Sequence, residues 1–261
     1  MDLSLNNKRA LVCGSSQGIG LAIAQELALL GASCTLLARN EERLKEAVKT
    51  LHSSETQQHG YLIADFNDFK NVENVVLQFT KENAVHILIN NSGGPAGGPI
   101  TEADPQAFLN AFQQHLICNQ VITQAVIPGM KKENYGRIVN IISTSVKIPL
   151  KGLGVSNTVR GAVASWAKTM ANELGAFGIT VNNVLPGATS TARLSSIINN
   201  KVQKTGISKE DAEEEMMAAI PMKRFAQPEE IAAAAAFLAS PAAAYITGVS
   251  IPVDGGRTGS I

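Results

Sequence analysis

The sequence predicts an α/β fold built on one doubly wound parallel sheet with helices on both faces. Short apolar and β-branched runs alternate with longer stretches of helical period, and a glycine-rich turn joins the first strand to the first helix. Such alternation, with right-handed crossovers, makes the strands parallel and covers both faces of the sheet. With 261 residues, 45% of them apolar, the chain can bury one large core, so we expect a single domain over residues 1–261.

The predicted elements follow one another regularly. Short apolar runs predict strands at residues 9–13, 33–38, 61–64, 86–90, 137–143, 179–185 and 249–252. Apolar residues at helical spacing predict helices at 18–30 and 41–52, and helical segments lie between the later strands. The alanine run 232–236 continues a helical pattern that begins at Pro228, Glu229 and Glu230, which predicts a tightly packed helix.

Residues 189–227 depart from this alternation. The segment is polar, holds two short helical patterns, and includes an acidic, methionine-containing stretch at 211–217 followed by Pro221. It follows the carboxyl end of a strand, where a lid over a ligand cleft would lie. We therefore expect a substrate lid here, with a surface helical hairpin as the alternative.

Composition argues against several classes of function. The 22 basic residues balance 22 acidic ones, so no net field attracts nucleic acid or an anionic membrane. The first residues lack a signal-peptide core, and no apolar run approaches the ~20 residues that span a bilayer. Cys13, Cys34 and Cys118 form no C-x-x-C pair, and neither they nor the histidines have metal-ligand spacing. We expect a cytoplasmic protein with buried cysteines and no metal site.

The turn after the first strand has the residues of a phosphate-binding loop. It reads Cys13-Gly14-Ser15-Ser16-Gln17-Gly18-Ile19-Gly20. Glycines let the backbone turn sharply and approach a pyrophosphate, and the helix N-terminus that follows offers free N–H groups. We expect residues 14–20 to cradle a dinucleotide, although a glycine trio also occurs in ordinary turns.

The spacing of these glycines resembles the short-chain dehydrogenase/reductase family, and the resemblance continues along essentially the whole chain. It implies a Rossmann-like fold, a nicotinamide cofactor, and assembly as a homotetramer or homodimer. Residues 135–143 and 172–187 look most similar to 3-oxoacyl-acyl-carrier-protein reductases. Further cofactor-binding positions implied by the resemblance are Asp65 and Phe66 at the adenine, the run Asn90-Asn91-Ser92-Gly93, and Pro186, Gly187 and Thr191 over the nicotinamide amide.

The end of the second strand indicates which cofactor binds. An acidic residue there would accept hydrogen bonds from a ribose 2′-hydroxyl, whereas an arginine can grip a 2′-phosphate. The chain has Ala38-Arg39-Asn40, so we expect NADP, with NAD as the second choice. Arg39 as a solvated charge near a helix cap is the alternative interpretation.

The resemblance also implies a catalytic serine, tyrosine and lysine, and here the chain departs from the family. Ser143 matches the serine that positions a carbonyl oxygen. At the tyrosine and lysine positions the chain instead has Ser156 and Arg160. No shift of register restores the pair, because no lysine follows four residues after any tyrosine of the chain: Tyr61, Tyr135 or Tyr245.

The replacements keep the geometry but not the chemistry. Residues four apart on a helix share a face, so Ser156 and Arg160 would point into the same cleft. An aliphatic hydroxyl is a far weaker acid than tyrosine, whose pKa is ~10. Arginine can hydrogen-bond the ribose and stabilise an oxyanion, but it cannot pass on a proton. The predicted site therefore lacks its obvious acid.

His115 is a candidate for the missing proton donor. An ungapped count back from Pro128 places the family's helix asparagine, which holds a relay water, on His115. A histidine titrates near ~6.5 and can donate directly or through water. A structural histidine is the alternative, and Asn119 supplies the amide if the register shifts. Both lie on one stripe that faces inward or toward a partner subunit: Phe108, Phe112, His115, Asn119, Ile122 and Val126.

Three functions fit these observations. The first is an NADP-dependent oxidoreductase for a ketone or secondary alcohol, including 3-oxoacyl thioesters, in which Ser143 and Arg160 polarise the oxygen and the proton comes from His115, Ser156 or water. The second is a nucleotide-binding protein that has lost turnover. The third is lyase chemistry, as in family relatives that release halide. Those relatives typically lack the glycine motif and retain the tyrosine, which argues against the third.

Overall fold

Seven parallel strands form one sheet in the order β3-β2-β1-β4-β5-β6-β7, in a computed structural model that describes residues 1–259. The order reverses between β1 and β4, where a doubly wound sheet opens a crevice at the carboxyl ends of its strands. The strands are β1 (Arg9–Cys13), β2 (Ser33–Ala38), β3 (Gly60–Ile63), β4 (Ile87–Asn90), β5 (Gly136–Ile141), β6 (Ile179–Pro186) and β7 (Ser250–Val253).

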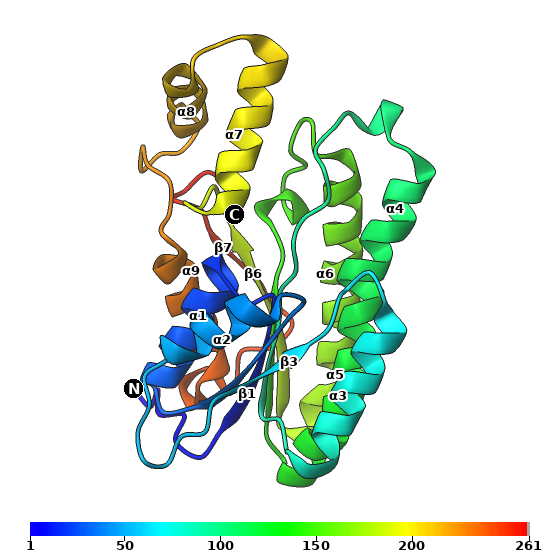
Figure 1. Cartoon of the computed structure of the whole chain (residues 1–261), viewed down its shortest axis with the longest axis vertical. Coiled ribbons are helices and arrows are strands. Elements are labelled where there is room, and N and C mark those ends of the chain that lie inside the picture. Colours follow the sequence, from blue (N-terminus) through cyan, green and yellow to red (C-terminus); the bar gives the residue numbers. More distant parts are fainter. Residues whose placement is uncertain (260–261) are drawn as a thin grey trace.

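Helices cover both faces of this sheet, as the alternating sequence predicts (Figure 1). One face carries α1 (Gly18–Leu29), α2 (Glu41–Lys49) and α9 (Pro228–Ala239), and the other carries α3 (Phe69–Glu82), α5 (Cys118–Glu133) and α6 (Gly154–Leu174). The remaining helices are α4 (Pro105–Phe112), which packs on α6, and α7 (Ala192–Thr205) and α8 (Lys209–Ala218), which rise above the carboxyl edge of the sheet.

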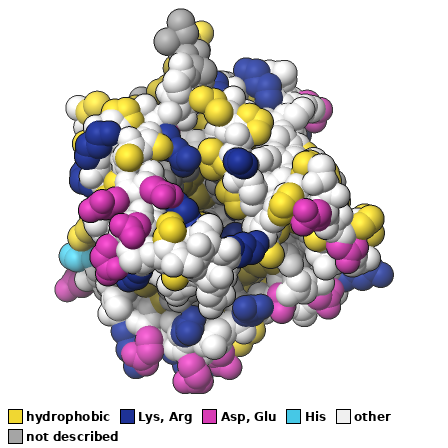
Figure 2. All heavy atoms as spheres, turned by 90° about the horizontal axis from the view of Figure 1, so that it is seen from above, with side chains coloured by type: hydrophobic (Ala, Val, Ile, Leu, Met, Phe, Trp, Pro, Cys, Tyr) yellow, Lys and Arg dark blue, Asp and Glu magenta, His cyan; other side chains and the backbone are white. Residues whose placement is uncertain are grey.

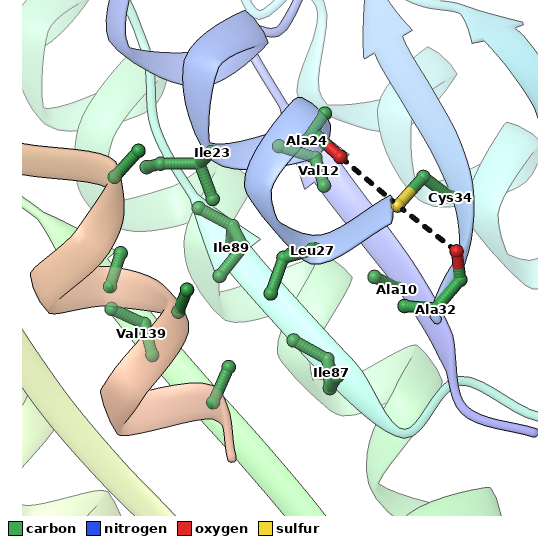
Figure 3. Packing of buried hydrophobic residues seen from close by; sticks show 14 of the residues in the cluster. Ala10, Val12, Ile23, Ala24, Leu27, Ala32, Cys34, Ile87, Ile89 and Val139 are labelled. Atoms are coloured by element: carbon green, nitrogen blue, oxygen red, sulfur yellow. Dashed lines mark hydrogen bonds between the residues drawn. The ribbon is translucent and has the colours of Figure 1, made fainter. Parts of the chain in front are cut away.

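The core on the first face forms where α1 lies across the sheet. Ile23 and Leu27 of α1 meet Val12 and Ile89 of the strands (Figure 3). Alanines on α1 and α9 allow the two helices to approach closely, which confirms that the alanine run forms a tightly packed helix. The thiol of Cys34 lies in this core, directs its sulfur toward the carbonyl of Ala24, and has its pKa raised to about 12 by burial.

The predicted elements are present, with small differences at their ends. Helix α2 ends at Lys49 rather than at residue 52, and β5 ends at Ile141 rather than at residue 143. Ser143 therefore lies beyond the strand, as the N-cap of a short 3-10 turn. The three cysteines are buried and unpaired, as expected. Within residues 1–259, no helix combines the length and the apolar character that crossing a membrane requires.

The segment 189–227 folds as two helices on a closed base. Leu194 and Ile198 of α7 pack against Ala212 of α8. The base is a parallel bridge between Thr189 and Ala226, whose backbone bonds include Ser190 N–H to the Ala226 carbonyl at 2.8 Å. The two ends of the segment thus meet beside the carboxyl end of β6, and the Met222 amide also donates to the Gly255 carbonyl after β7 at 3.2 Å.

A row of side-chain amides crosses four strands inside the sheet. Asn90, Asn140, Asn183 and Ser250 are register partners on β4, β5, β6 and β7. Each amide donates to the next residue, with distances of 2.9, 2.9 and 3.0 Å along the row. The three asparagines are at most 3% exposed. Because a one-residue slip would leave these buried groups unpaired, the row fixes the register of the strands.

We expect Asn140→Ala to lower the free energy of unfolding by about 2–4 kcal/mol, because it leaves the Asn90 amide donor and the Asn183 oxygen buried without partners. Urea unfolding monitored by circular dichroism measures this change. Asn74→Ala, at an exposed position of α3, is the matched control and should stay within about 0.5 kcal/mol of the parent. Equal stability of the two variants would contradict a structural role for the row.

Candidate functional site

A cleft of about 870 Å³ opens above the carboxyl edge of the sheet. Figure 2 looks onto this face and shows the surface hollowed near its centre, with basic side chains around the hollow. The volume lies within the roughly 300–1,000 Å³ typical of small-molecule sites. The cleft is lined by the ends of six strands and by the N-terminal ends of α1 and α7. It coincides with the crevice that the reversal of strand order predicts.

The glycine turn forms one wall of the cleft. Gly14 and Gly18 have φ of +57° and +60°, a conformation that favours glycine. A Cβ on Gly20 would lie 2.3 Å from the Gly14 carbonyl oxygen, so only glycine allows α1 to begin so close to β1. Of the predicted residues 14–20, all except Ser15 and Gly20 line the cleft.

Ser15 and Asn91 hold this turn in place from behind. The Ser15 hydroxyl is buried and donates to the Val12 carbonyl at 2.6 Å. The Asn91 amide donates to the carbonyls of Cys13 and Gly14 at 3.3 and 3.1 Å. The amide thereby ties the end of β4 to the turn after β1, and its side chain acts on the loop that faces the cleft.

Arg39 and Asp65 stand together at one end of the cleft, after β2 and β3. Arg39 is exposed and forms no ion pair with a carboxylate of residues 1–259. The cap of α2 is Asn40, whose side chain accepts from the Arg43 amide, so Arg39 itself does not cap the helix. Asp65 accepts from the backbone and side chain of Asn67 at 3.0 and 2.9 Å. Phe66 lines the same end.

Ser143, Ser156 and Arg160 line the other half of the cleft together. The Ser143 oxygen accepts from the Ser145 amide at 3.1 Å, so its hydroxyl hydrogen remains available to a ligand. The remaining predicted positions, Ser92, Gly93, Pro186, Gly187 and Thr191, also line the cleft.

Arg160 is a buried cation. It is only 8% exposed, and its Nη1 donates to the Ile141 carbonyl at 2.9 Å. Its Nε is buried without a partner. Burial and then the charge of Arg193 lower the pKa of Arg160 to about 10. The guanidinium therefore stays protonated at neutral pH, which suits oxyanion stabilisation and excludes a role as proton shuttle.

His115 lies behind the cleft wall, in a π-helical turn (Gln113–Ile117) between α4 and α5. The sequence predicts one uninterrupted stripe there; the π turn inserts one residue into the helix, and all six stripe residues are nevertheless buried or half-buried. The ring is 2% exposed, as the inward-facing prediction requires. Its Nδ1 is 2.6 Å from the Ser92 hydroxyl, and its Nε2 is buried without a partner.

The environment keeps His115 neutral. Burial, and then the charges of Arg160 and Arg193, lower the pKa of the imidazole well below its usual value. At pH 7 one ring nitrogen carries hydrogen and the other accepts. The neighbouring amide, Asn119, is buried and does not line the cleft.

Sequence reasoning missed Arg193, which enters the cleft from the first turn of α7. Its Nη2 donates to the Pro95 carbonyl at 2.5 Å, so its side chain reaches from α7 to the loop after β4. A cation in the first turn of a helix is opposed by the helix dipole. That unfavourable placement, two residues after Thr191, is the signal that the sequence offered.

We expect His115→Asn to flatten the pH dependence of stability below pH 6.5. The unfolded chain binds a proton at His115 near pH ~6.5 and the native chain does not, so native stability falls by up to about 1.4 kcal/mol per unit as pH decreases. Urea unfolding at pH 7.0 and 5.5 measures the difference. His52→Asn, at an exposed position, should retain the parent slope; the same slope in both variants would contradict a neutral His115.

Comparisons with known proteins agree with this geometry. A family model described as enoyl-(acyl carrier protein) reductase matches residues 14–258. The NADPH-dependent reductase BacG of Bacillus subtilis (strain 168) is 31% identical over 98% of this chain and 100% of its own length. The 3-oxoacyl-[acyl-carrier-protein] reductase FabG of Vibrio cholerae is 32% identical over 97% of this chain and 98% of its own.

Solved structures match over nearly their full length. The structure of YwfH, an NADPH-dependent reductase involved in bacilysin biosynthesis, aligns with a TM-score of 0.91 at 30% identity over 97% of this chain and 99% of that one. L-sorbose reductase from Gluconobacter frateurii, complexed with NADPH and L-sorbose, aligns with a TM-score of 0.93 at 29% identity over the whole of both chains. The chain therefore belongs to the short-chain dehydrogenase/reductase family.

Proposed function

We propose that the protein is an NADP-dependent oxidoreductase that interconverts a ketone and a secondary alcohol. The observation that carries the proposal is the convergence of Ser143 and the buried Arg160 on the same cleft as the glycine turn. A hydroxyl donor and a fixed cation are what a developing alkoxide requires. Relatives matched over nearly their full length include the 3-oxoacyl-[acyl-carrier-protein] reductase and the L-sorbose reductase bound to NADPH and L-sorbose.

The residues present fit a nicotinamide dinucleotide phosphate. A Cβ on Gly18 would meet only the Thr191 side chain, at 3.5 Å, which leaves open space above the N-terminus of α1 for a pyrophosphate. Arg39, exposed at the far end of the cleft, would hold the 2′-phosphate, and Asp65 the adenine. When bound, the cofactor supplies or accepts the hydride.

Arg160 and Ser143 have different roles at the carbonyl oxygen of the substrate. Ser143 donates its free hydroxyl hydrogen to the carbonyl oxygen, and the Arg160 charge stabilises the alkoxide and the ribose hydroxyls beside it. The alkoxide takes its proton from a water on the His115 side of the cleft, and the hydroxide that remains is reprotonated from bulk solvent. Support for this route lies in the 2.6 Å hydrogen bond between His115 Nδ1 and the hydroxyl of Ser92, which joins the buried imidazole to a residue of the cleft lining. Ser156 lines the cleft but is too weak an acid to act unaided.

A second candidate is a nucleotide-binding protein without turnover, which the serine at position 156 favours. Both candidate functions require NADPH binding, but only the oxidoreductase would consume NADPH. As part of the oxidoreductase proposal, the 189–227 segment is the substrate lid, and the chain works as a cytoplasmic homotetramer or homodimer.

We expect the purified protein to oxidise NADPH with at least one member of a panel of 3-oxoacyl thioesters, ketones and ketoses. Ser143→Ala should lower kcat by about 100-fold, the scale measured for loss of one oxyanion donor, with the Kd for NADPH within twofold of the parent. Absorbance and fluorescence of NADPH measure the two quantities. Ser53→Ala, in an exposed loop, serves as the control. NADPH binding without consumption across the panel would leave the binding protein as the function.

We expect Arg39→Gln to raise the Kd for NADPH by about 10-fold or more and to leave the Kd for NADH unchanged, because only NADPH carries the phosphate that the charged hydrogen bonds reach. Fluorescence titration with both cofactors measures this. Lys132→Gln removes an exposed charge at the end of α5 and should change neither constant. Equal losses for both cofactors would exclude a phosphate role for Arg39.

A further inference from the structure

The charged groups of the cleft are divided between its two ends. Only four charged side chains of residues 1–259 line it: Arg39, Asp65, Arg160 and Arg193. Arg39 and Asp65 follow β2 and β3, whereas Arg160 bonds to the end of β5 and Arg193 follows β6. Strands β1 and β4 separate the two pairs in the sheet. The half of the cleft that holds Ser143 therefore contains two cations and no carboxylate.

Arg193 lines this half of the cleft and reaches from α7 to the loop after β4. Its Nη2 donates to the Pro95 carbonyl, and its guanidinium lies against Gly94, where a Cβ would be 3.4 Å from the same nitrogen and 3.7 Å from the central carbon. The side chain thus spans from α7 to the loop after β4. Its other nitrogens have no hydrogen-bond partner within residues 1–259, and the side chain remains exposed.

Electrostatics in this half of the cleft are unfavourable without an anion. Neither Arg160 nor Arg193 forms an ion pair with a carboxylate of the described chain. Partial burial lowers the pKa of Arg193, and the charge of Arg193 contributes to the lowered pKa of Arg160. Arg193 also sits at the positive end of the α7 dipole. An anion bound at Arg193 would relieve all three effects together.

We infer that Arg193 binds a carboxylate of the substrate, so that the enzyme acts on a small oxo acid or the corresponding hydroxy acid. This inference rests on the proposed function and assigns its substrate class. The cofactor phosphates have other donors, at the glycine turn and Arg39. Arg193, Arg160 and Ser143 line the same half of the cleft, so a carboxylate at Arg193 would share that half with the carbonyl at Ser143. The phosphate of a thioester carrier, at the end of a long flexible arm, fits this position less well.

The inference is tested with pairs of substrates, each an oxo acid and its methyl ester, which share a carbon skeleton and differ in the charge of the carboxyl group. Pyruvate, acetoacetate and levulinate are compared with their methyl esters as substrates for NADPH oxidation. We expect at least one acid to exceed its ester by 10-fold or more in kcat/KM. Arg193→Gln should raise KM for that acid by about 10-fold or more, the scale of a lost charge-assisted hydrogen bond, with little change for the ester. Arg193→Lys keeps the charge and should retain part of the preference.

Lys204→Gln is the matched control, because it removes a charge from an exposed position of the same helix. It should leave the acid preference intact. The Kd for NADPH should stay within twofold in every variant, and thermal unfolding of each variant checks that it is folded. A rise of 10-fold in the Kd for NADPH on Arg193→Gln would assign Arg193 to the cofactor and overturn the inference. A neutral thioester, such as the acetoacetyl thioester of N-acetylcysteamine, provides a second check. The inference would also be overturned if this thioester were reduced faster than every acid and if Arg193→Gln did not change that rate.

An equilibrium measurement separates this inference from the proposed function. The NADP⁺-loaded protein is titrated calorimetrically with each of the three acids and each ester. Acid binding that Arg193→Gln weakens, in a protein that consumes no NADPH, would support the anion site and reject the oxidoreductase. NADPH-dependent turnover of ketones or sugars with no acid binding would support the oxidoreductase and reject the anion site.

Discussion

The row of buried amides across β4, β5, β6 and β7 is the constraint on which the site depends. In a parallel sheet covered by helices on both faces, a strand that shifts its pairing by one residue still buries its apolar side chains. Apolar packing alone therefore does not fix the register of such strands. Hydrogen bonds among Asn90, Asn140 and Asn183 remove that freedom. The residues just beyond them are those that line the cleft. Asn91 follows one amide directly, and Ser143 and Gly187 lie three and four residues after the other two.

Regular elements of the fold were predictable because their signals are local. Apolar runs placed all seven strands to within a few residues, helical periods placed α1, α2 and the start of α9, and the glycine turn located the cleft. The π turn at His115 was not predictable, since one inserted residue leaves the flanking periods intact. Ser15 looks like a loop residue in sequence but points its hydroxyl back to Val12, which only the folded turn determines. Arg193 reaches the site because α7 rises from a base beside β6, a tertiary arrangement that no spacing records.

The substitutions at positions 156 and 160 form part of one electrostatic arrangement. A buried guanidinium and a second, more exposed one make this half of the cleft positive, and burial together with these two charges lowers the pKa of the His115 imidazole well below its usual value. A lysine at position 160 could lose its proton in such surroundings, whereas arginine holds its charge. The arrangement stabilises negative charge on a ligand strongly. It leaves proton supply to neutral groups and water.

The parallel bridge between Thr189 and Ala226 marks where sequence changes that affect the ligand cleft are separated from changes that affect the sheet. Within the described residues, the segment between its ends meets the strand ends at this bridge, along the cleft lining, and where the Met222 amide donates to the Gly255 carbonyl after β7. The length and composition of the segment 189–227 can therefore vary with little effect on the seven strands, because the bridge that joins its two ends stays in the same place beside β6. Ligand preference and fold stability can therefore change independently in evolution. The whole segment 189–227 is a natural unit to exchange between relatives in a redesign.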